Sequence, residues 1–323
     1  MIGVAMIGVV CLNPALDVTH HVAAVDWSGV NRPDGVYARP GGKGLNVART
    51  LHALGVEVLV IGVAGGATGE AVTTGLAALA VPAAFTWVAG ETRRTFTVVD
   101  GRTGHAATFN EPGPVIAADG YAEFRDRYAS ALAGCAAVVL SGSLPPGLAP
   151  GSYAELTAMA VAAGVPVLLD AHGDALALGA AAGPAVVKPN LAELEMFAGR
   201  PLAGAPAVAA AAAELRAAGP QAVVVSMGPG GLYADTDDGC WQAVPPTVVA
   251  GNATGAGDAA AAGLAYGLAR GQPWDERLRH AVALGTAAAL APVAGEFNPS
   301  DYATLLDATV VTRTMAAAAG EAG

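Results

Sequence analysis

Residues 135–142 read CAAVVLSG, a short run that is apolar throughout until it reaches a serine and a glycine. Unbroken apolar character of this length is typical of a parallel strand covered by helices on both faces. Alanine-rich stretches of helical composition separate it from four similar runs: VEVLVIGV (56–63), VPVLLD (165–170), PAVVKPN (184–190) and QAVVVSMG (221–228). The alternation predicts one doubly wound, mostly parallel α/β domain spanning residues 1–323.

Polar or glycine-containing turns follow most of the predicted strands. In open parallel sheets, ligands bind at the carboxyl ends of the strands, so we expect these turns to gather around one cleft. The turns are NPALD (13–17), SGSLPPG (141–147), DAHGD (170–174), KPN (188–190) and SMGPGG (226–231).

Two segments interrupt the alternation. Residues 16–38 and about 91–110 are richer in Thr, Val, Arg and Asp, and the second has an alternating pattern around TFTVV. This composition predicts a small antiparallel sheet assembled from two chain segments. A sheet that projects over the cleft can serve as a lid and as an oligomer surface.

The overall charge excludes several classes of partner. A formal net charge of -11 argues against nucleic acid and anionic membranes, which both require a basic face. Any anion site must therefore be local. The three cysteines, at positions 11, 135 and 240, are far apart and odd in number, which favours a reducing cytoplasm over a disulfide framework.

GNATGAGDAAAAG (251–263) places a single carboxylate directly behind a glycine turn. Gly255 and Gly257 permit tight backbone geometry ahead of a predicted helix, whose first amides would point toward a common anion. The helix dipole favours the ionised form of Asp258, and an ordinary aspartate has a pKa of about 3.9. We therefore expect an available base at neutral pH; the alternative is an ordinary helix start with an acidic residue near its cap.

A second glycine-rich segment, PGGKGLNVARTLHALG (40–55), carries Lys43 between glycines. It is not a Walker A loop, since the glycine spacing and the following Ser or Thr are missing. Close glycines indicate that backbone passes near a ligand, although a lone lysine more often solvates a loop. No GxGxxG follows the first strand, which disfavours an oxidoreductase that binds a dinucleotide.

VKPNLAEL (187–194) places Asn190 and Glu193 three residues apart at a strand-to-helix junction. By themselves they are most simply a helix cap and its capping-box glutamate. They are also a pair of oxygen donors suited to a water-rich Mg²⁺ ion. SMGPGGL (226–232) also has two interpretations: it is equally consistent with a hairpin turn and with a loop that binds a nucleotide.

Together these motifs resemble the ribokinase-like, or PfkB, family of sugar kinases, over nearly the whole chain. The branch with 1-phosphofructokinase and tagatose-6-phosphate kinase is the most similar. The motifs that carry the resemblance occur in the family's order: NPALD (13–17), GGKGLN (41–46), GETR (90–93), SGSLPPG (141–147), VKPNLAELE (187–195), SMGPGG (226–231) and GAGD (255–258).

The resemblance implies ATP-dependent phosphorylation of a ketohexose phosphate, either fructose 1-phosphate or tagatose 6-phosphate. Asp258 would be the base, and the GAGD turn, with Gly255 and the amides of Ala256, Gly257 and Asp258, would form the anion hole. The implied substrate ligands are Asp17, Gly41, Gly42, Asn46, Asn110 and Ser143 for the sugar, with Lys43 and Arg93 for its phosphate. The implied ATP and Mg²⁺ ligands are Lys188, Asn190, Glu193, Ser226, Gly228 and Gly231, with Asn190 and Glu193 reaching the metal through water.

Two other functions stay open at this point. One is a kinase for an unphosphorylated sugar or nucleoside, and the other is a non-catalytic phosphosugar sensor on the same scaffold. The resemblance also implies a homodimer joined through the lid and an adenine pocket walled by residues 284–295. Asn252 and Ala253 stand where the family commonly has Asp or Ser followed by Thr, so activation by a monovalent cation is not carried over.

Overall fold

The computed structural model describes residues 6–246, 254–291 and 295–314. Its strands are β1 (Met6–Cys11), β2 (Ala15–Val22), β3 (Gly35–Gly41), β4 (Val58–Ala64), β5 (Ala83–Trp87), β6 (Arg93–Asp100), β7 (Ala106–Asn110), β8 (Cys135–Ser141), β9 (Val167–Asp170), β10 (Val186–Val187), β11 (Ala222–Ser226), β12 (Leu232–Thr236), β13 (Gly239–Val244) and β14 (Val310–Thr314). Its helices are α1 (Lys43–Ala53), α2 (Gly66–Ala78), α3 (Ala118–Leu132), α4 (Ser152–Ala162), α5 (Gly173–Ala181), α6 (Leu191–Ala198), α7 (Gly204–Ala217), α8 (Ala256–Ala269), α9 (Trp274–Leu290) and α10 (Pro299–Ala308).

The large sheet has the strand order β14-β13-β12-β11-β10-β9-β8-β1-β4-β5, and every neighbouring pair from β11 to β5 is parallel. Each of the five apolar runs in the sequence coincides largely with one of these strands, so the predicted doubly wound sheet is confirmed.

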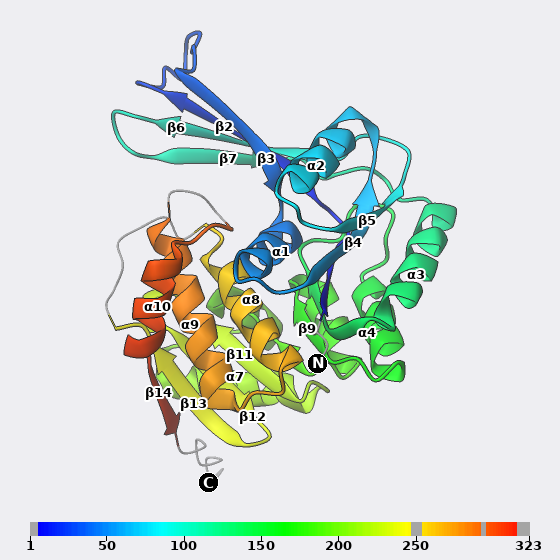
Figure 1. Cartoon of the computed structure of the whole chain (residues 1–323). Coiled ribbons are helices and arrows are strands. Elements are labelled where there is room, and N and C mark those ends of the chain that lie inside the picture. Colours follow the sequence, from blue (N-terminus) through cyan, green and yellow to red (C-terminus); the bar gives the residue numbers. More distant parts are fainter. Residues whose placement is uncertain (1–5, 247–253, 292–294, 315–323) are drawn as a thin grey trace.

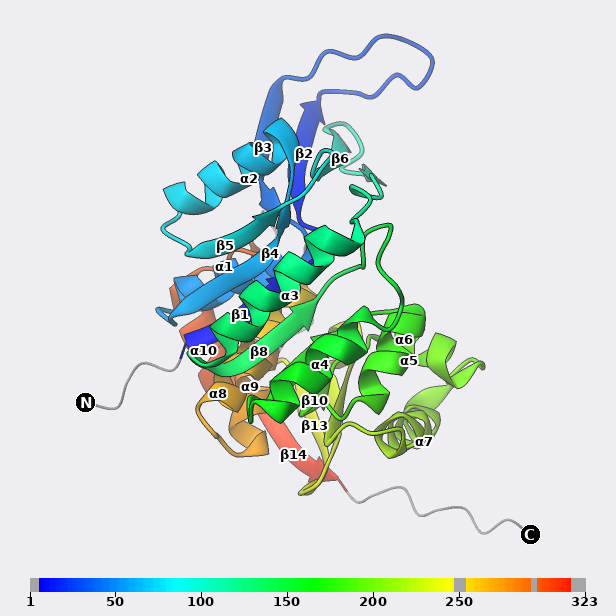
Figure 2. The same cartoon turned by 90° about the vertical axis from the view of Figure 1, so that its right-hand side faces the viewer.

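Helices cover both faces of this sheet, as Figures 1 and 2 show. Alternate side chains of β1 point to opposite sides, with Ile7 and Val9 in one apolar cluster and Val10 in the other, together with Leu12 just after the strand. The first cluster is completed by α1, α2, α8 and α9, and the second by α3, α4, α5 and α7. Burial on both faces explains why the strand sequences are continuously apolar.

One edge of the sheet is antiparallel. β11, β12, β13 and β14 pair antiparallel in that order, and β14 comes from the end of the described chain. The SMGPGGL segment forms the tight turn between β11 and β12, in which Gly231 has a φ of 81°. The hairpin interpretation of this segment is therefore correct.

The lid is a four-stranded sheet in the order β3-β2-β6-β7 that projects from the main body (Figure 1). It is built from the two predicted segments, each an antiparallel hairpin, while the central pair β2 and β6 runs parallel. Strand alternation turns Asp17, Thr95 and Asn110 toward the cavity beneath the lid, whereas Val36 and Phe109 are exposed.

No helix within the described residues is long and apolar enough to cross a membrane.

Candidate active site

The carboxyl ends of the central strands, the start of α8 and the lid enclose one cavity of 1790 Å³. Segments far apart in the sequence meet there, as expected where a parallel sheet changes its winding direction. Most of the implied site residues line it: Asp17, Gly42, Lys43, Asn46, Arg93, Asn110, Ser143, Lys188, Asn190, Glu193, Ser226, Gly255, Gly257 and Asp258. Gly41, Ala256, Gly228 and Gly231 are not among its lining residues.

The glycine turn at residues 255–257 begins α8 as predicted. Gly255 precedes the helix with a φ of 84°, a left-handed conformation that glycine adopts without steric cost. The first main-chain bond of the helix joins the Ala259 amide to the Gly255 carbonyl, so the amides just before it have no partner within the helix. Since Gly257 and Asp258 line the cavity, this helix start can bind an anion there.

Asp258 is 7% exposed and accepts a 2.8 Å hydrogen bond from Asn46. Burial and, to a smaller extent, the nearby Asp170 carboxylate raise the pKa of Asp258 to about 7, against the opposing effects of the Asn46 hydrogen bond and two lysines. The expectation of ordinary acidity was wrong, because it considered the helix dipole and not desolvation. A carboxyl that titrates near neutrality is well matched to general base catalysis.

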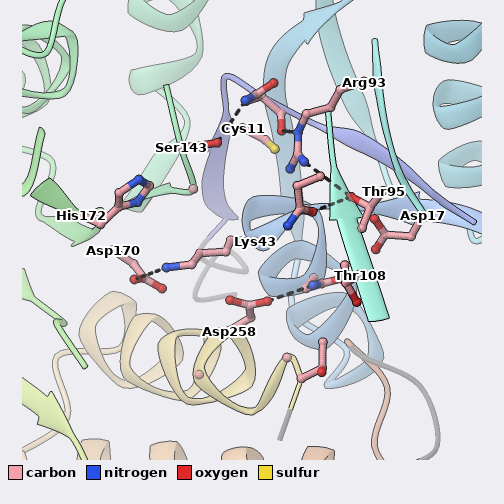
Figure 3. Close-up of a pocket in the computed structure, with 18 of the residues that line it drawn as sticks. Cys11, Asp17, Lys43, Arg93, Thr95, Thr108, Ser143, Asp170, His172 and Asp258 are labelled. Carbon is pink, nitrogen blue, oxygen red and sulfur yellow. Dashed lines mark hydrogen bonds and ion pairs between the residues drawn. The ribbon is translucent and has the colours of Figure 1, made fainter. Parts of the chain in front are cut away.

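Asp170 lies at the end of β9 and pairs with both lysines that line the cavity; Figure 3 shows its contact with Lys43. Its side chain is 1% exposed and lies 3.4 Å from both Lys43 Nζ and Lys188 Nζ. Lys43 Nζ is also 3.4 Å from Glu193 Oε1, and these carboxylates raise the pKa of Lys43 above its ordinary range. Asp170 was not singled out in the sequence, although a carboxylate at the end of a buried parallel strand is a usable signal.

Asn190 and Glu193 form a capping box at the start of α6. The Glu193 amide donates to Asn190 Oδ1 (2.9 Å), and the Asn190 amide donates to Glu193 Oε2 (2.8 Å). The interpretation of these two residues as a helix cap is therefore correct. Both residues also line the cavity. The described part of the chain holds no cluster of three His, Cys, Asp or Glu side chains with metal-binding geometry, so a metal here would need waters or phosphates as further ligands.

The opposite end of the cavity lies under the lid, where Arg93 and Asp17 are found (Figure 3). Arg93 Nε donates to the main-chain carbonyl of Asn13 (3.1 Å), and a second guanidinium nitrogen lies 3.4 Å from Thr95 Oγ1. Burial raises the pKa of Asp17. A Cβ on Gly41 would lie 1.9 Å from an Asp17 oxygen, so glycine is required for Asp17 to occupy this position.

Asn13 connects three segments beside Arg93. Its side-chain amide donates to Ser143 Oγ (3.0 Å) and to the Pro112 carbonyl (3.1 Å), while its main chain accepts from Arg93. The motif NPALD was noticed in the sequence, but no role for its asparagine was recognised. Ser143 and Arg93 are therefore held in one hydrogen-bonded group.

The residues expected on the nucleotide side lie partly in the cavity and partly beyond it. Ser226, at the end of β11, lines the cavity and bridges to Asn190, whereas Gly228 and Gly231 shape the hairpin turn beyond it. Asn252, Ala253 and part of the implied adenine wall lie outside the described residues.

Similarity to known proteins extends over nearly the whole chain. A model of the pfkB family of carbohydrate kinases matches residues 4–301. The chain is 37% identical to the 1-phosphofructokinase of Rhodobacter capsulatus over 314 residues, covering 96% of this chain and 98% of that protein. It is 38% identical to the 1-phosphofructokinase of Xanthomonas campestris pv. campestris over 263 residues, covering 80% and 83% respectively. The structure of phosphofructokinase-2 from Escherichia coli in complex with potassium matches this chain with a TM-score of 0.89 at 32% identity, covering 94% of this chain and 98% of that one. Another similar structure is the tetrameric inhibited form of the same protein.

Proposed function

The chain belongs to the pfkB family of carbohydrate kinases, and on this premise we propose that it transfers the γ-phosphoryl group of ATP to a hydroxyl of a ketohexose phosphate. Both curated relatives are named 1-phosphofructokinase, which makes fructose 1-phosphate the first substrate to test and tagatose 6-phosphate the second. The observation that carries the proposal is the placement of Asp258 and the first amides of α8 in the same cavity as Arg93 and Asp17.

Asp258 is the base in the proposed reaction. It accepts the proton of the attacking hydroxyl, and the oxygen of that hydroxyl then bonds to the γ-phosphorus while ADP leaves. The amides at the start of α8 hold the negative charge on the transferred group, a role that requires only positioning and fixed dipoles. This assignment explains how a chain of net charge -11 binds polyphosphate, because backbone amides provide the positive potential locally.

Arg93 is the proposed ligand of the phosphate already on the sugar. Its guanidinium faces the cavity beneath the lid, and an arginine fork is suited to bidentate phosphate binding. Asp17, Gly42, Asn110 and Ser143 are the proposed sugar contacts, and Gly41, which does not line the cavity, supports the position of Asp17. The family resemblance assigns Lys43 to the same phosphate as Arg93. In the structure its ammonium lies between Asp170 and Glu193, so it must exchange a partner to serve there.

ATP and Mg²⁺ are proposed to bind at the other end of the cavity. Lys188 and Ser226 would contact the nucleotide, while Asn190 and Glu193 would hold Mg²⁺ through water because their oxygens already serve the helix cap. Mg²⁺ supplies neutralisation of phosphate charge when it is bound.

A coupled assay of ADP release over a panel of sugar phosphates and free sugars tests the proposal. We expect turnover with fructose 1-phosphate or tagatose 6-phosphate. Turnover on free sugars or nucleosides alone would favour the unphosphorylated-substrate kinase. Tight binding of a sugar phosphate without any ADP release would establish the non-catalytic sensor instead.

Neighbouring arginines provide a matched pair of variants. Arg93→Ala should raise the KM for the sugar phosphate about tenfold to a hundredfold, the value of a lost charge-assisted hydrogen bond. Arg94→Ala is the control, since Arg94 is exposed and paired with Glu111. Equal kinetics for the two variants would remove Arg93 from the phosphate site.

We also propose that two copies associate through the exposed face of the lid. Val36 and Phe109 are 55% and 57% exposed. They lie on the face of the lid sheet that points away from the cavity. Sedimentation of a Val36→Glu/Phe109→Glu variant should show a monomer. Val161→Glu, at an exposed valine on α4, should leave the assembly unchanged. A wild-type monomer would overturn this mode of association.

A further inference from the structure

Asn46 lies in the fourth position of α1, three residues after Lys43 and on the same face of that helix. It is 6% exposed, and its Nδ2 donates a 2.8 Å hydrogen bond to Asp258 Oδ2, which is 7% exposed. The two residues are 212 positions apart and meet because α1 packs against α8. The family resemblance makes Asn46 a sugar ligand, and it does not assign this contact.

The direction of the Asn46 amide has a chemical reason. An ionised carboxylate only accepts hydrogen bonds, so the NH₂ group is the end of the amide that it requires. Asn46 Oδ1 points instead toward Gly295, where an added Cβ would lie 3.0 Å away. Within the described residues Oδ1 is buried without a hydrogen-bond partner. Among residues 6–246, 254–291 and 295–314, one polar atom of Asn46 thus has no partner while its donor is kept on Asp258.

Charged groups from several elements surround Asp258. Lys43 of α1 and Lys188 after β10 favour its ionised form, and Asp170 of β9 opposes it. On α9, the residue against the first turn of α8 is Gly285, which carries no charge. Asn46 differs from the charged neighbours because it is hydrogen-bonded to the carboxylate directly.

We propose that Asn46 is a positioning residue for the proton acceptor: its amide fixes the Asp258 carboxylate in place and favours the ionised form that removes the substrate proton. This inference rests on the proposed role of Asp258 as base. A hydrogen bond to the charged form of an acid stabilises that form, and its loss shifts the titration upward. Asn46 thus opposes the desolvation that burial imposes on the same carboxylate.

A ligand-free measurement tests the hydrogen bond without requiring turnover. The ¹³Cγ resonance of Asp258 is titrated by NMR in protein labelled at aspartate, and the resonance is assigned by its loss in Asp258→Asn. In wild type we expect a midpoint near the pKa of about 7. Asn46→Leu should move the midpoint upward by about 1, the value of one hydrogen bond to a charged group. Asn46→Ala provides the same test if leucine prevents folding, and Asn110→Ala should leave the midpoint unchanged.

The kinetic readout separates this role from sugar binding. With the proposed substrate, Asn46→Ala should move the acidic limb of kcat upward by the same amount and lower kcat at pH 6 about tenfold. A higher KM with an unshifted limb and an unshifted NMR midpoint would make Asn46 a sugar ligand only, and would overturn the inference. An upward NMR midpoint in a protein that lacks kinase activity would instead refute the proposed function while leaving the hydrogen bond established.

Discussion

If Asp258 is the base, its buried carboxyl should make the rate of the proposed reaction depend on pH near neutrality. Its pKa of about 7 means that it is half ionised at pH 7 and about one-eleventh ionised at pH 6. If the ionised form is the base, kcat should fall about fivefold between these values and approach a plateau near pH 8. An aspartate of ordinary acidity would give no change over this interval, because it is fully ionised throughout.

The assay is ADP release at saturating ATP, Mg²⁺ and sugar phosphate between pH 5.5 and 9, in buffers of constant ionic strength. A phosphate on the substrate titrates with a pKa of about 6, so the wild-type profile alone does not identify the titrating group. Asp170→Asn provides the control. Removing this negative neighbour lowers the pKa of Asp258, so the acidic limb should move to lower pH, whereas a limb caused by the substrate would stay where it is.

Two results would refute this reasoning. A kcat that is flat from pH 6 to pH 8 would show that burial does not control the base. A limb that stays in place in Asp170→Asn would assign the titration to the substrate or to another group. The comparison uses the shape of each profile and is independent of the absolute rate, because Asp170 also holds Lys43 and Lys188.

Three further changes have defined outcomes. Asp258→Asn should lower kcat about 10²- to 10⁴-fold with ligand binding retained in calorimetry. The same variant should be more stable than wild type above pH 7, by on the order of 4 kcal/mol in denaturant unfolding. Folding raises the pKa of Asp258, so the wild-type protein loses stability as the pH rises from about 4 to about 7. Equal stability at pH 8 would contradict the desolvation argument. Gly41→Ala should raise the KM for the sugar phosphate without changing the KM for ATP, because the added Cβ displaces the flexible Asp17 carboxylate. Gly151→Ala is the control and should behave as wild type, since a Cβ at Gly151 would meet no neighbouring atom within 4 Å. Glu193→Ala should increase the Mg²⁺ concentration needed for half-maximal rate and lower unfolding stability by about 1 kcal/mol through loss of the cap; an unchanged Mg²⁺ dependence would leave Glu193 with the cap alone.

Much of the fold could be predicted from local sequence. The strand in CAAVVLSG and the helix that follows Gly255 are encoded within windows of a few residues, by apolar runs and by turn chemistry. The two-segment lid was also readable, because its composition departs from the alternation around it. The parallel pairing of β2 with β6 was not, since it joins strands separated by much of the first hundred residues.

The candidate site divides in the same way. Asp258 and the Asn190–Glu193 pair were singled out from motif and spacing, and Arg93 from the family resemblance, although the motif could not distinguish the helix cap from the proposed metal site. Asp170 was missed, because nothing near it in the sequence shows that two lysines converge on it.

The sequence by itself determined the doubly wound sheet, the glycine turn ahead of α8 and the identity of the carboxylate behind it, since each depends on interactions between neighbouring residues. Only the tertiary structure decided the acidity of that carboxylate. The group that donates to it, Asn46, is 212 residues away, and the burial that raises its pKa arises from the packing of α1 and α8 over the sheet. Desolvation and charge pairing depend on distances in space, which a local pattern of residues does not contain.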